Sequence, residues 1–248
     1  MIPADFATPG LHIASNGTPP TRFQVLGERS SGTNYVKRLL GRNTPLRPTE
    51  ALGWKHGPPH ALAIPADLIV IVAVRHAAHW ARSMHAKPWH TPAAIQQLTF
   101  SDFIRAPWHT IIDRERYFQP EARLGILGQP LQLDRDPATG LAYDDLFALR
   151  QGKLRGHLSF ANRGCSFVLV RMETAIADPA GFLEQMRQTF ALPTPDGPLR
   201  PVVKRLGSKF KPAIEPRPET PAILSSDDMA FLRGRLDLSQ EQALGYSY

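Results

Sequence analysis

The feature that most limits how this chain can fold is an unbroken apolar run, LIVIVAV, at residues 68–74. Most of its residues are β-branched, and Pro65 and Arg75 bound it. An apolar run without polar alternation is typical of a strand covered on both faces, as in the middle of a parallel sheet. We therefore expect a buried strand at 68–74.

Strand-like and helix-like segments alternate around this run. The sequence predicts further short strands at Phe23–Leu26, around Leu52–His56 and at Ser166–Val170. Apolar spacing predicts helices at Thr33–Leu40, Ala77–Ala86 and Pro179–Phe190, the last with Asp178 as its N-cap. Such alternation favours an α/β fold with a central parallel sheet flanked by helices.

The 248 residues are predicted to form a single domain. Residues 1–21 are rich in Pro, Gly and Thr, so we expect an irregular lead-in there. Residues 91–163 are predicted to be a mainly helical insertion that covers the acceptor site, including an amphipathic segment at Tyr143–Leu158. Residues Ser225–Leu244 are expected to form two short helices.

Charge and composition restrict the class of partner. With 29 Lys and Arg against 22 Asp and Glu, the net charge of +7 suits a polyanionic ligand, a nucleic acid or an acidic glycan. Cys165 is the only cysteine, which excludes an internal disulfide and a cysteine-based zinc cluster. No apolar stretch approaches about eighteen residues, and the first ten residues lack the layout of a secretory signal. We expect a cytoplasmic protein with no membrane span.

The loop GERSSG, between the strand at 23–26 and the helix from Thr33, has the layout of an anion site. Backbone N–H groups at a helix N-terminus attract negative charge, and glycines let a ligand approach the backbone. The loop is not a Walker A motif, because no GK[ST] follows. An ordinary strand-to-helix turn capped by serine is the alternative.

Arg75 follows the apolar strand, and Ser83 comes eight residues later on the expected helix. Ligands of open α/β sheets bind beyond the carboxyl ends of the strands. Arg75 and Ser83 are therefore predicted to reach a second phosphate together. A solvated cation at the strand end is the alternative for Arg75.

Four segments resemble the sulfotransferase family, namely GERSSGTNYVKRLL, WKHGPP, LIVIVAVRHAAHWARSM and SFVLVRMETAIADP. These enzymes are P-loop-like α/β proteins that take a sulfuryl group from 3′-phosphoadenosine 5′-phosphosulfate and release adenosine 3′,5′-bisphosphate. The resemblance implies a 5′-phosphosulfate loop made of Arg29, Ser30, Ser31, Gly32, Thr33 and Asn34. It implies that the 3′-phosphate is held by Arg75 and Ser83, and that a basic loop with Lys204, Arg205 and Gly207 closes over the 3′-phosphate and adenine. A solvated basic loop is the alternative for this last segment.

Two positions depart from the family pattern. Ser30 stands where the family has a loop lysine that contacts the bridging oxygen, so Arg29 must take over that contact or the contact is absent. His76-Ala77 stands where most members have Asp-Pro after the strand arginine. Residues 91–140 show no resemblance to the family.

His56 is the predicted general base. It lies in WKHGPP, which is similar to the family's Lys-Thr-His-Leu-Pro segment, and a neutral imidazole accepts a proton near neutral pH. Lys55 is then a donor to the sulfuryl oxygens, and Arg29 the third predicted catalytic residue. A packing histidine and an outward-facing lysine are the alternatives. His76 and His79 have helical spacing but no evident third ligand, so we predict no metal.

We predict sulfuryl transfer to a hydroxyl or amine of an unidentified acceptor, such as a glycan or another small molecule, with no nucleic-acid partner. Four arginines of 91–140 hint at an anionic or glycan acceptor: Arg105, Arg114, Arg116 and Arg123. Two other functions stay open. A P-loop-type nucleotide phosphotransferase would use the same loop, but the sequence has no evident magnesium-binding acid after a strand. A noncatalytic binder of polyanions is supported by the net charge alone.

Overall fold

The computed structural model describes residues 2–118, 123–203, 207 and 209–248. Contacts divide the chain into two compact units. The first comprises Met1–His76, Lys153–Leu206 and Asp237–Tyr248, and the second comprises Ala77–Gly152 and Gly207–Leu236. The expectation of a single domain stays a prediction. No described helix is long and apolar enough to cross a membrane.

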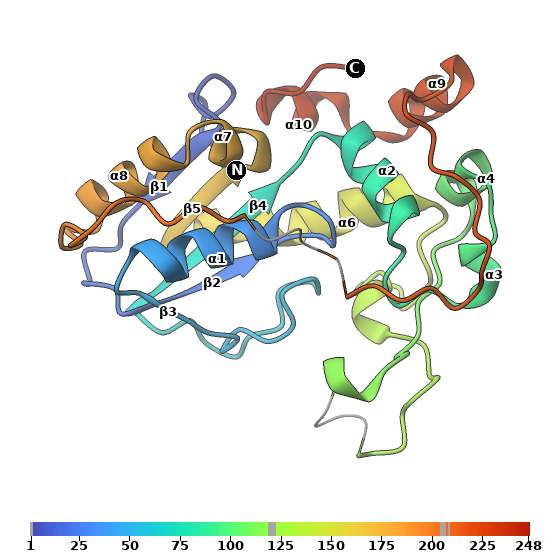
Figure 1. Cartoon of the computed structure of the whole chain (residues 1–248), viewed down its shortest axis with the longest axis horizontal. Helices are drawn as coiled ribbons and strands as arrows, with labels where there is room; N and C mark the ends of the chain where they lie inside the picture. Colours follow the sequence, from blue (N-terminus) through green and yellow to red (C-terminus); the bar gives the residue numbers. More distant parts are fainter. Residues whose placement is uncertain (1, 119–122, 204–206, 208) are drawn as a thin grey trace. The chain divides into compact units, whose positions relative to one another are not determined.

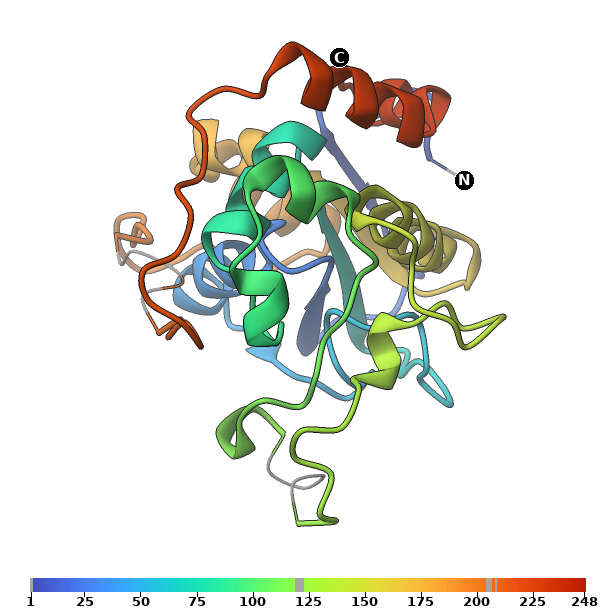
Figure 2. The same cartoon turned by 90° about the vertical axis from the view of Figure 1, so that its right-hand side faces the viewer.

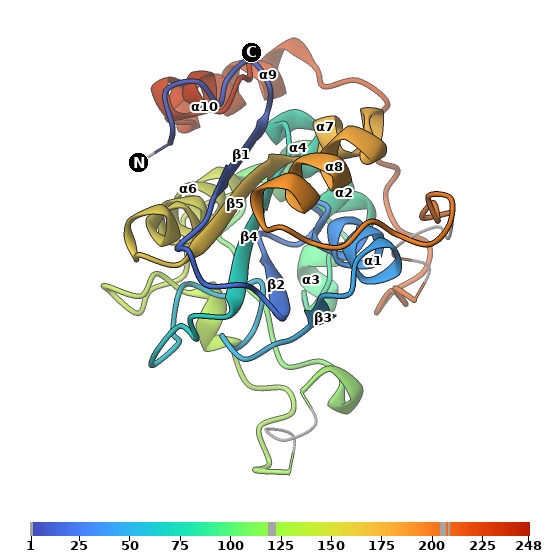
Figure 3. The same ribbon diagram turned by 90° about the vertical axis from the view of Figure 1, so that its left-hand side faces the viewer.

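The first unit contains a five-stranded sheet in the order β1-β5-β4-β2-β3 (Figure 3). The strands are β1 (Leu11–Ala14), β2 (Arg22–Leu26), β3 (Arg47–Pro48), β4 (Leu68–Val74) and β5 (Ser166–Arg171). The last four run parallel, whereas β1 pairs antiparallel with β5, with Leu11 opposite Val170. The sheet is therefore mixed, and the expectation that 1–21 is wholly irregular is wrong, because its residues 11–14 form an edge strand.

Each face of this sheet carries its own apolar cluster, because side chains alternate along a strand. On one face, Ile69 and Ile71 of β4 pack with residues of α1 (Thr33–Asn43) and α8 (Pro179–Thr189), which lie together in Figure 3. On the other, Val70 and Val72 pack with Leu154 and Leu158 of α6 (Leu146–Leu158). All seven residues of β4 are buried, which confirms the strand expected at 68–74.

The segment around Leu52–His56 is not a strand, contrary to expectation. The buried side chain of Gln24 in β2 bonds to this segment instead, donating to the Gly53 carbonyl and accepting from the Leu52 amide, both at 2.8 Å. Gly53 has φ +84°, which an extended strand does not allow. The neighbour of β2 on this side is the two-residue β3, at Arg47–Pro48.

The helices after the strands agree with the sequence pattern. Asp178 caps α8 by accepting from the Gly181 amide at 2.8 Å, as predicted. Between β5 and α8 lies the short helix α7 (Met172–Ala177), which was not predicted. The expected pair of helices near the end of the chain is present as α9 (Ser226–Arg235) and α10 (Leu238–Ala243), seen in Figure 1.

The second unit is less helical than predicted. After α2 (Ala77–Ala86) come the short helices α3 (Ala93–Gln96) and α4 (Phe100–Arg105). Most of the described residues from 106 to 145 are irregular apart from the 3-10 turns η1 (Glu115–Tyr117) and η2 (Gln132–Asp134). The segment before α9 returns alongside α2 and α3 (Figure 2). From this segment the Arg217 guanidinium donates to the carbonyls of His85, Ala86 and Gln96.

Candidate functional site

The loop from Gly27 to Gly32 connects β2 to α1 at the carboxyl end of the parallel strands. A Cβ atom on Gly27 would lie 2.6 Å from the Ala73 carbonyl oxygen, and one on Gly32 would lie 2.8 Å from Met172 Cγ. Gly32 has φ +100° and precedes α1 with no side-chain hydrogen bond to cap the helix. The loop therefore needs glycine at both positions, and it leaves the amide end of α1 available to an anion.

Two predicted loop side chains are buried beneath this turn. Ser31 is fully buried, and its Oγ has no hydrogen-bond partner among the described residues. Arg29 is only 5% exposed, and its guanidinium carbon lies 5.6 Å from the centre of the Trp54 ring. Glu28, also buried, accepts at its carbonyl from the Ser31 amide at 3.2 Å and so closes the turn. A buried hydroxyl and a buried guanidinium are donors suited to an anion in this loop.

Arg75, at the end of β4, reaches the same loop. Its Nη1 donates to the Ser30 carbonyl at 3.1 Å, and Ser30 has the left-handed backbone φ of +65°. Because β3 and β4 lie on opposite sides of β2, the strand order changes direction between β2 and β4. This is the position at which open α/β sheets bind ligands. Ser83 belongs to the second unit, so its cooperation with Arg75 stays a prediction.

Lys55 and His56 are both tied to the loop. Lys55 Nζ donates to Asn34 Oδ1 at 2.7 Å, and the Lys55 carbonyl accepts from the Gly27 amide at 3.0 Å. His56 Nδ1 lies 2.6 Å from the Gly27 carbonyl oxygen. Since a carbonyl only accepts, Nδ1 carries the proton and Nε2 of the neutral ring is left as the acceptor. The two predicted catalytic residues of this segment therefore lie against the predicted anion loop.

The surroundings adjust the charge of both residues. Burial, with a smaller contribution from Lys37, lowers the pKa of Lys55 to about 8. Burial also holds the pKa of His56 well below its usual value, and the neighbouring Lys55 and Arg29 lower it further. At pH 7 Lys55 is thus mostly charged and His56 is neutral.

Helix α6 contributes two anchors that the sequence pattern did not reveal. Lys153 Nζ donates to the His56 carbonyl at 2.6 Å, and His157 Nε2 lies 3.0 Å from the Gly57 carbonyl oxygen. Both side chains are buried, so the expectation of a simply amphipathic segment at Tyr143–Leu158 is wrong. Burial, followed by the charge of Lys153, lowers the pKa of His157 to about 4. The four-residue spacing of Lys153 and His157 on one helix face was the available signal.

Trp54 is a second feature that the sequence reasoning missed. Its ring lies 5.1 Å from Lys153 Nζ and meets the His56 ring edge-on at 5.4 Å. Because Arg29 also contacts this ring, one cation of the loop and one of α6 lie close to it. The result is a cluster of positive groups around one aromatic ring, which favours an anionic ligand.

The outcome differs among the remaining predicted residues. Lys204 and Arg205 lie outside the described residues, and Gly207 belongs to the second unit. Thr33 is buried at the first position of α1. Over the described ranges, no group of three or more His, Cys, Asp or Glu is arranged to hold a metal ion, and the absence of a metal stays a prediction.

No protein-family model, curated protein or solved structure matches this chain. The similarity to sulfotransferases therefore rests on the quoted segments alone.

Proposed function

We propose that the chain is a sulfotransferase with a P-loop-like architecture, which moves a sulfuryl group from 3′-phosphoadenosine 5′-phosphosulfate to a hydroxyl or amine of an acceptor. The observation that carries the proposal is the hydrogen bond from His56 Nδ1 to the Gly27 carbonyl. It joins a neutral imidazole, with Nε2 as its acceptor atom, to the loop that we propose binds the donor's anionic group.

The donor's 5′-phosphosulfate would be bound by the amide end of α1, the Ser31 hydroxyl and Arg29. Ser31 Oγ is buried without a hydrogen-bond partner among the described residues, so an anion oxygen in the loop would satisfy it. Arg29 lies one residue before Ser30, which occupies the family's lysine position, and its buried guanidinium supports the charge on the departing nucleotide. Arg75 supports the loop through Ser30, so its contribution to binding includes holding the loop in shape.

In the transfer, an oxygen lone pair of the acceptor forms the new S–O bond. The S–O bond to the bridging oxygen breaks, and its electron pair leaves with adenosine 3′,5′-bisphosphate. His56 Nε2 takes the acceptor's proton, and Lys55 stabilises the negative charge on the transferring oxygens. A bound anion offsets Lys55, Arg29 and Lys153, the cations that help to lower the pKa of His56. Donor binding thereby makes His56 a stronger base.

The donor site is tested by the thermal unfolding of the purified chain with adenosine 3′,5′-bisphosphate. A ligand at about one hundred times its Kd adds about 2.7 kcal/mol to the free energy of unfolding, which corresponds to roughly 5–10 °C in Tm. Arg75→Ala should reduce this shift. Arg47→Ala, in exposed β3 at the other end of the strands, is the matched control and should retain it.

Stabilisation by Mg-ATP alone would instead favour phosphotransfer. No change in Tm with either ligand would favour the alternative, in which the loop is an ordinary strand-to-helix turn. The catalytic role is tested by transfer of labelled sulfuryl groups to a panel of phenols, alcohols and amines. His56→Gln should keep the bisphosphate shift and lose transfer. Undiminished transfer by His56→Gln would refute its assignment as the base.

A further inference from the structure

The second unit contains a cavity that the proposed function does not use. Its volume is about 330 Å³, which lies within the roughly 300–1,000 Å³ of small-molecule sites. Much of its wall is apolar, formed by Pro92, Ala93, Ile111, Ile112 and Ala213. Residues from four separate parts of the chain (91–96, 111–114, 128 and 213) thus surround a space large enough for one or two rings.

Arg114 lines this cavity, and one nitrogen of its guanidinium group donates to no described residue. Its Nη2 donates to the Lys211 carbonyl, and its Nε lies 3.5 Å from Asp113 Oδ2. Its Nη1 is buried and has no hydrogen-bond partner among the residues that the structure describes. A buried cationic N–H without an acceptor is unfavourable, so this position calls for an acceptor from outside the described chain.

Other polar groups of the lining are already engaged. Asp113 Oδ1 lies 2.7 Å from His90 Nδ1, while its second oxygen faces Arg114. Gln96 donates to the Thr91 carbonyl and accepts from the Ala213 amide, both at 2.8 Å. Arg114 is therefore the lining side chain with donor capacity to offer a ligand.

We propose that this cavity binds a small organic anion, with its apolar body against Ile111, Ile112 and Pro92 and its anionic group hydrogen-bonded to Arg114 Nη1. The inference rests on the second unit alone. It holds whether or not the chain transfers sulfuryl groups, so the failure of one proposal leaves the other standing.

The test uses 2-naphthoate as the probe and its neutral isostere 2-naphthamide, each titrated into the full chain by calorimetry. A probe of this size is expected to bind with a Kd on the order of 1 mM. The amide should bind at least tenfold more weakly, because it lacks the charge that Arg114 recognises. Equal binding of the two probes, or no binding of 2-naphthoate, would overturn the proposal, and neither comparison requires a variant.

A pair of arginine variants locates the site. Arg114→Met should weaken 2-naphthoate binding at least tenfold. Arg116→Met is the matched control, because the Arg116 guanidinium packs 4.6 Å from the Tyr117 ring centre and does not line the cavity. Both variants are first checked for an unchanged circular dichroism spectrum. Equal loss of affinity in the two folded variants would refute the assignment to Arg114.

Discussion

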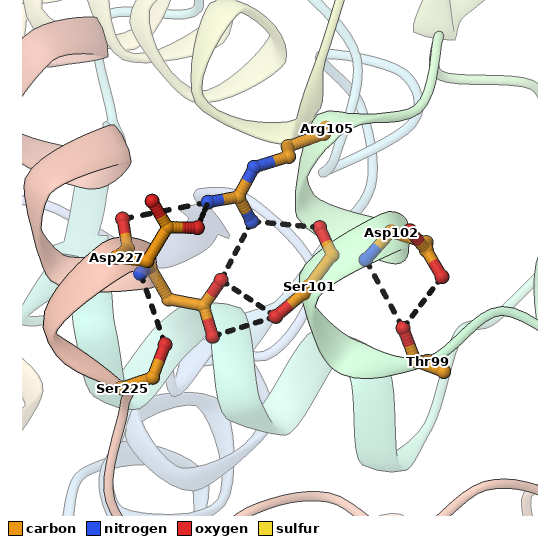
Figure 4. Close-up of polar contacts among 7 residues, drawn as sticks. Thr99, Ser101, Asp102, Arg105, Ser225 and Asp227 are labelled. Atoms are coloured by element: carbon orange, nitrogen blue, oxygen red, sulfur yellow. Dashed lines mark hydrogen bonds and ion pairs between the residues drawn. The ribbon is translucent and has the colours of Figure 1, made fainter.

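Replacement of Arg105 by methionine should destabilise the second unit through a carboxylate that it leaves buried. Arg105, at the end of α4, bonds to two acidic residues at the start of α9, with Nη1 2.6 Å from Asp228 Oδ1 and Nη2 2.6 Å from Asp227 Oδ2 (Figure 4). The Asp228 side chain is 4% exposed, whereas that of Asp227 is 86% exposed. The same guanidinium therefore makes one buried and one exposed ion pair.

The expected loss in the free energy of unfolding follows from this difference in exposure. Removal of one partner from a fully buried pair costs about 3–5 kcal/mol. Arg105 is itself 30% exposed, and the Ser101 hydroxyl still donates to Asp228 at 2.7 Å. We therefore expect Arg105→Met to lower the free energy of unfolding by about 2–3 kcal/mol, or roughly 5–10 °C in Tm. Asp227→Asn, which removes the exposed pair, should cost within about 0.5 kcal/mol.

The pH dependence provides a second readout. Burial acts to raise the pKa of the Asp228 carboxyl, but hydrogen bonds from Arg105, Ser101 and Ser225 outweigh it and hold that pKa below its usual range. A depressed carboxyl pKa gives stability that is present above the unfolded pKa and is lost as pH falls through the folded pKa. The difference in Tm between the wild type and Arg105→Met, measured by thermal unfolding, should therefore become smaller below about pH 4. Two results would refute the reasoning. One is a Tm difference between wild type and Arg105→Met that does not change with pH, and the other is an equal loss of stability in Arg105→Met and Asp227→Asn.

Three further predictions concern the loop and its anchors. Gly32→Ala should lower the free energy of unfolding, measured in urea, by about 1–2 kcal/mol, because φ is +100° there and the new Cβ would clash with Met172. An unchanged midpoint of urea unfolding would contradict this. Lys153→Met should raise the pKa of His56, followed by NMR of the ring protons, because it removes a nearby cation. Affinity for adenosine 3′,5′-bisphosphate should fall as pH rises through about 8, where Lys55 loses its proton, and Lys55→Arg should remove that dependence.

The parts of the fold that local pattern determines were predictable from the sequence. The strand at 68–74 and the helices from Thr33 and Ala77 begin where expected, because their apolar spacing and boundaries lie within each segment. The antiparallel strand at 11–14 was missed, because its four residues are stabilised by pairing with β5, far away in the sequence. The segment at 52–56 was assigned to a strand from its composition, whereas the side chain of Gln24 determines its turn.

The candidate site was predictable to a similar extent. The loop residues and His56 lie in short segments with recognisable order, and the structure brings His56 and Lys55 to the loop. Lys153 and His157 could not be found in this way, because their role depends on the approach of α6 to the backbone of 56–57. Their four-residue spacing places both side chains on one helix face, but it does not show which backbone that face contacts.

The pairing of β1 with β5 also has a consequence for the order of events during protein synthesis. Leu11 pairs with Val170, and Ala14 with Phe167. β1 therefore stays without its partner strand until more than 150 further residues have been synthesised. At a ribosome that adds about 5–20 residues each second, that delay is on the order of ten seconds or more. During this time the edge of the nascent sheet is open to other unpaired strands. We expect the growing chain to need chaperone protection until β5 has left the exit tunnel.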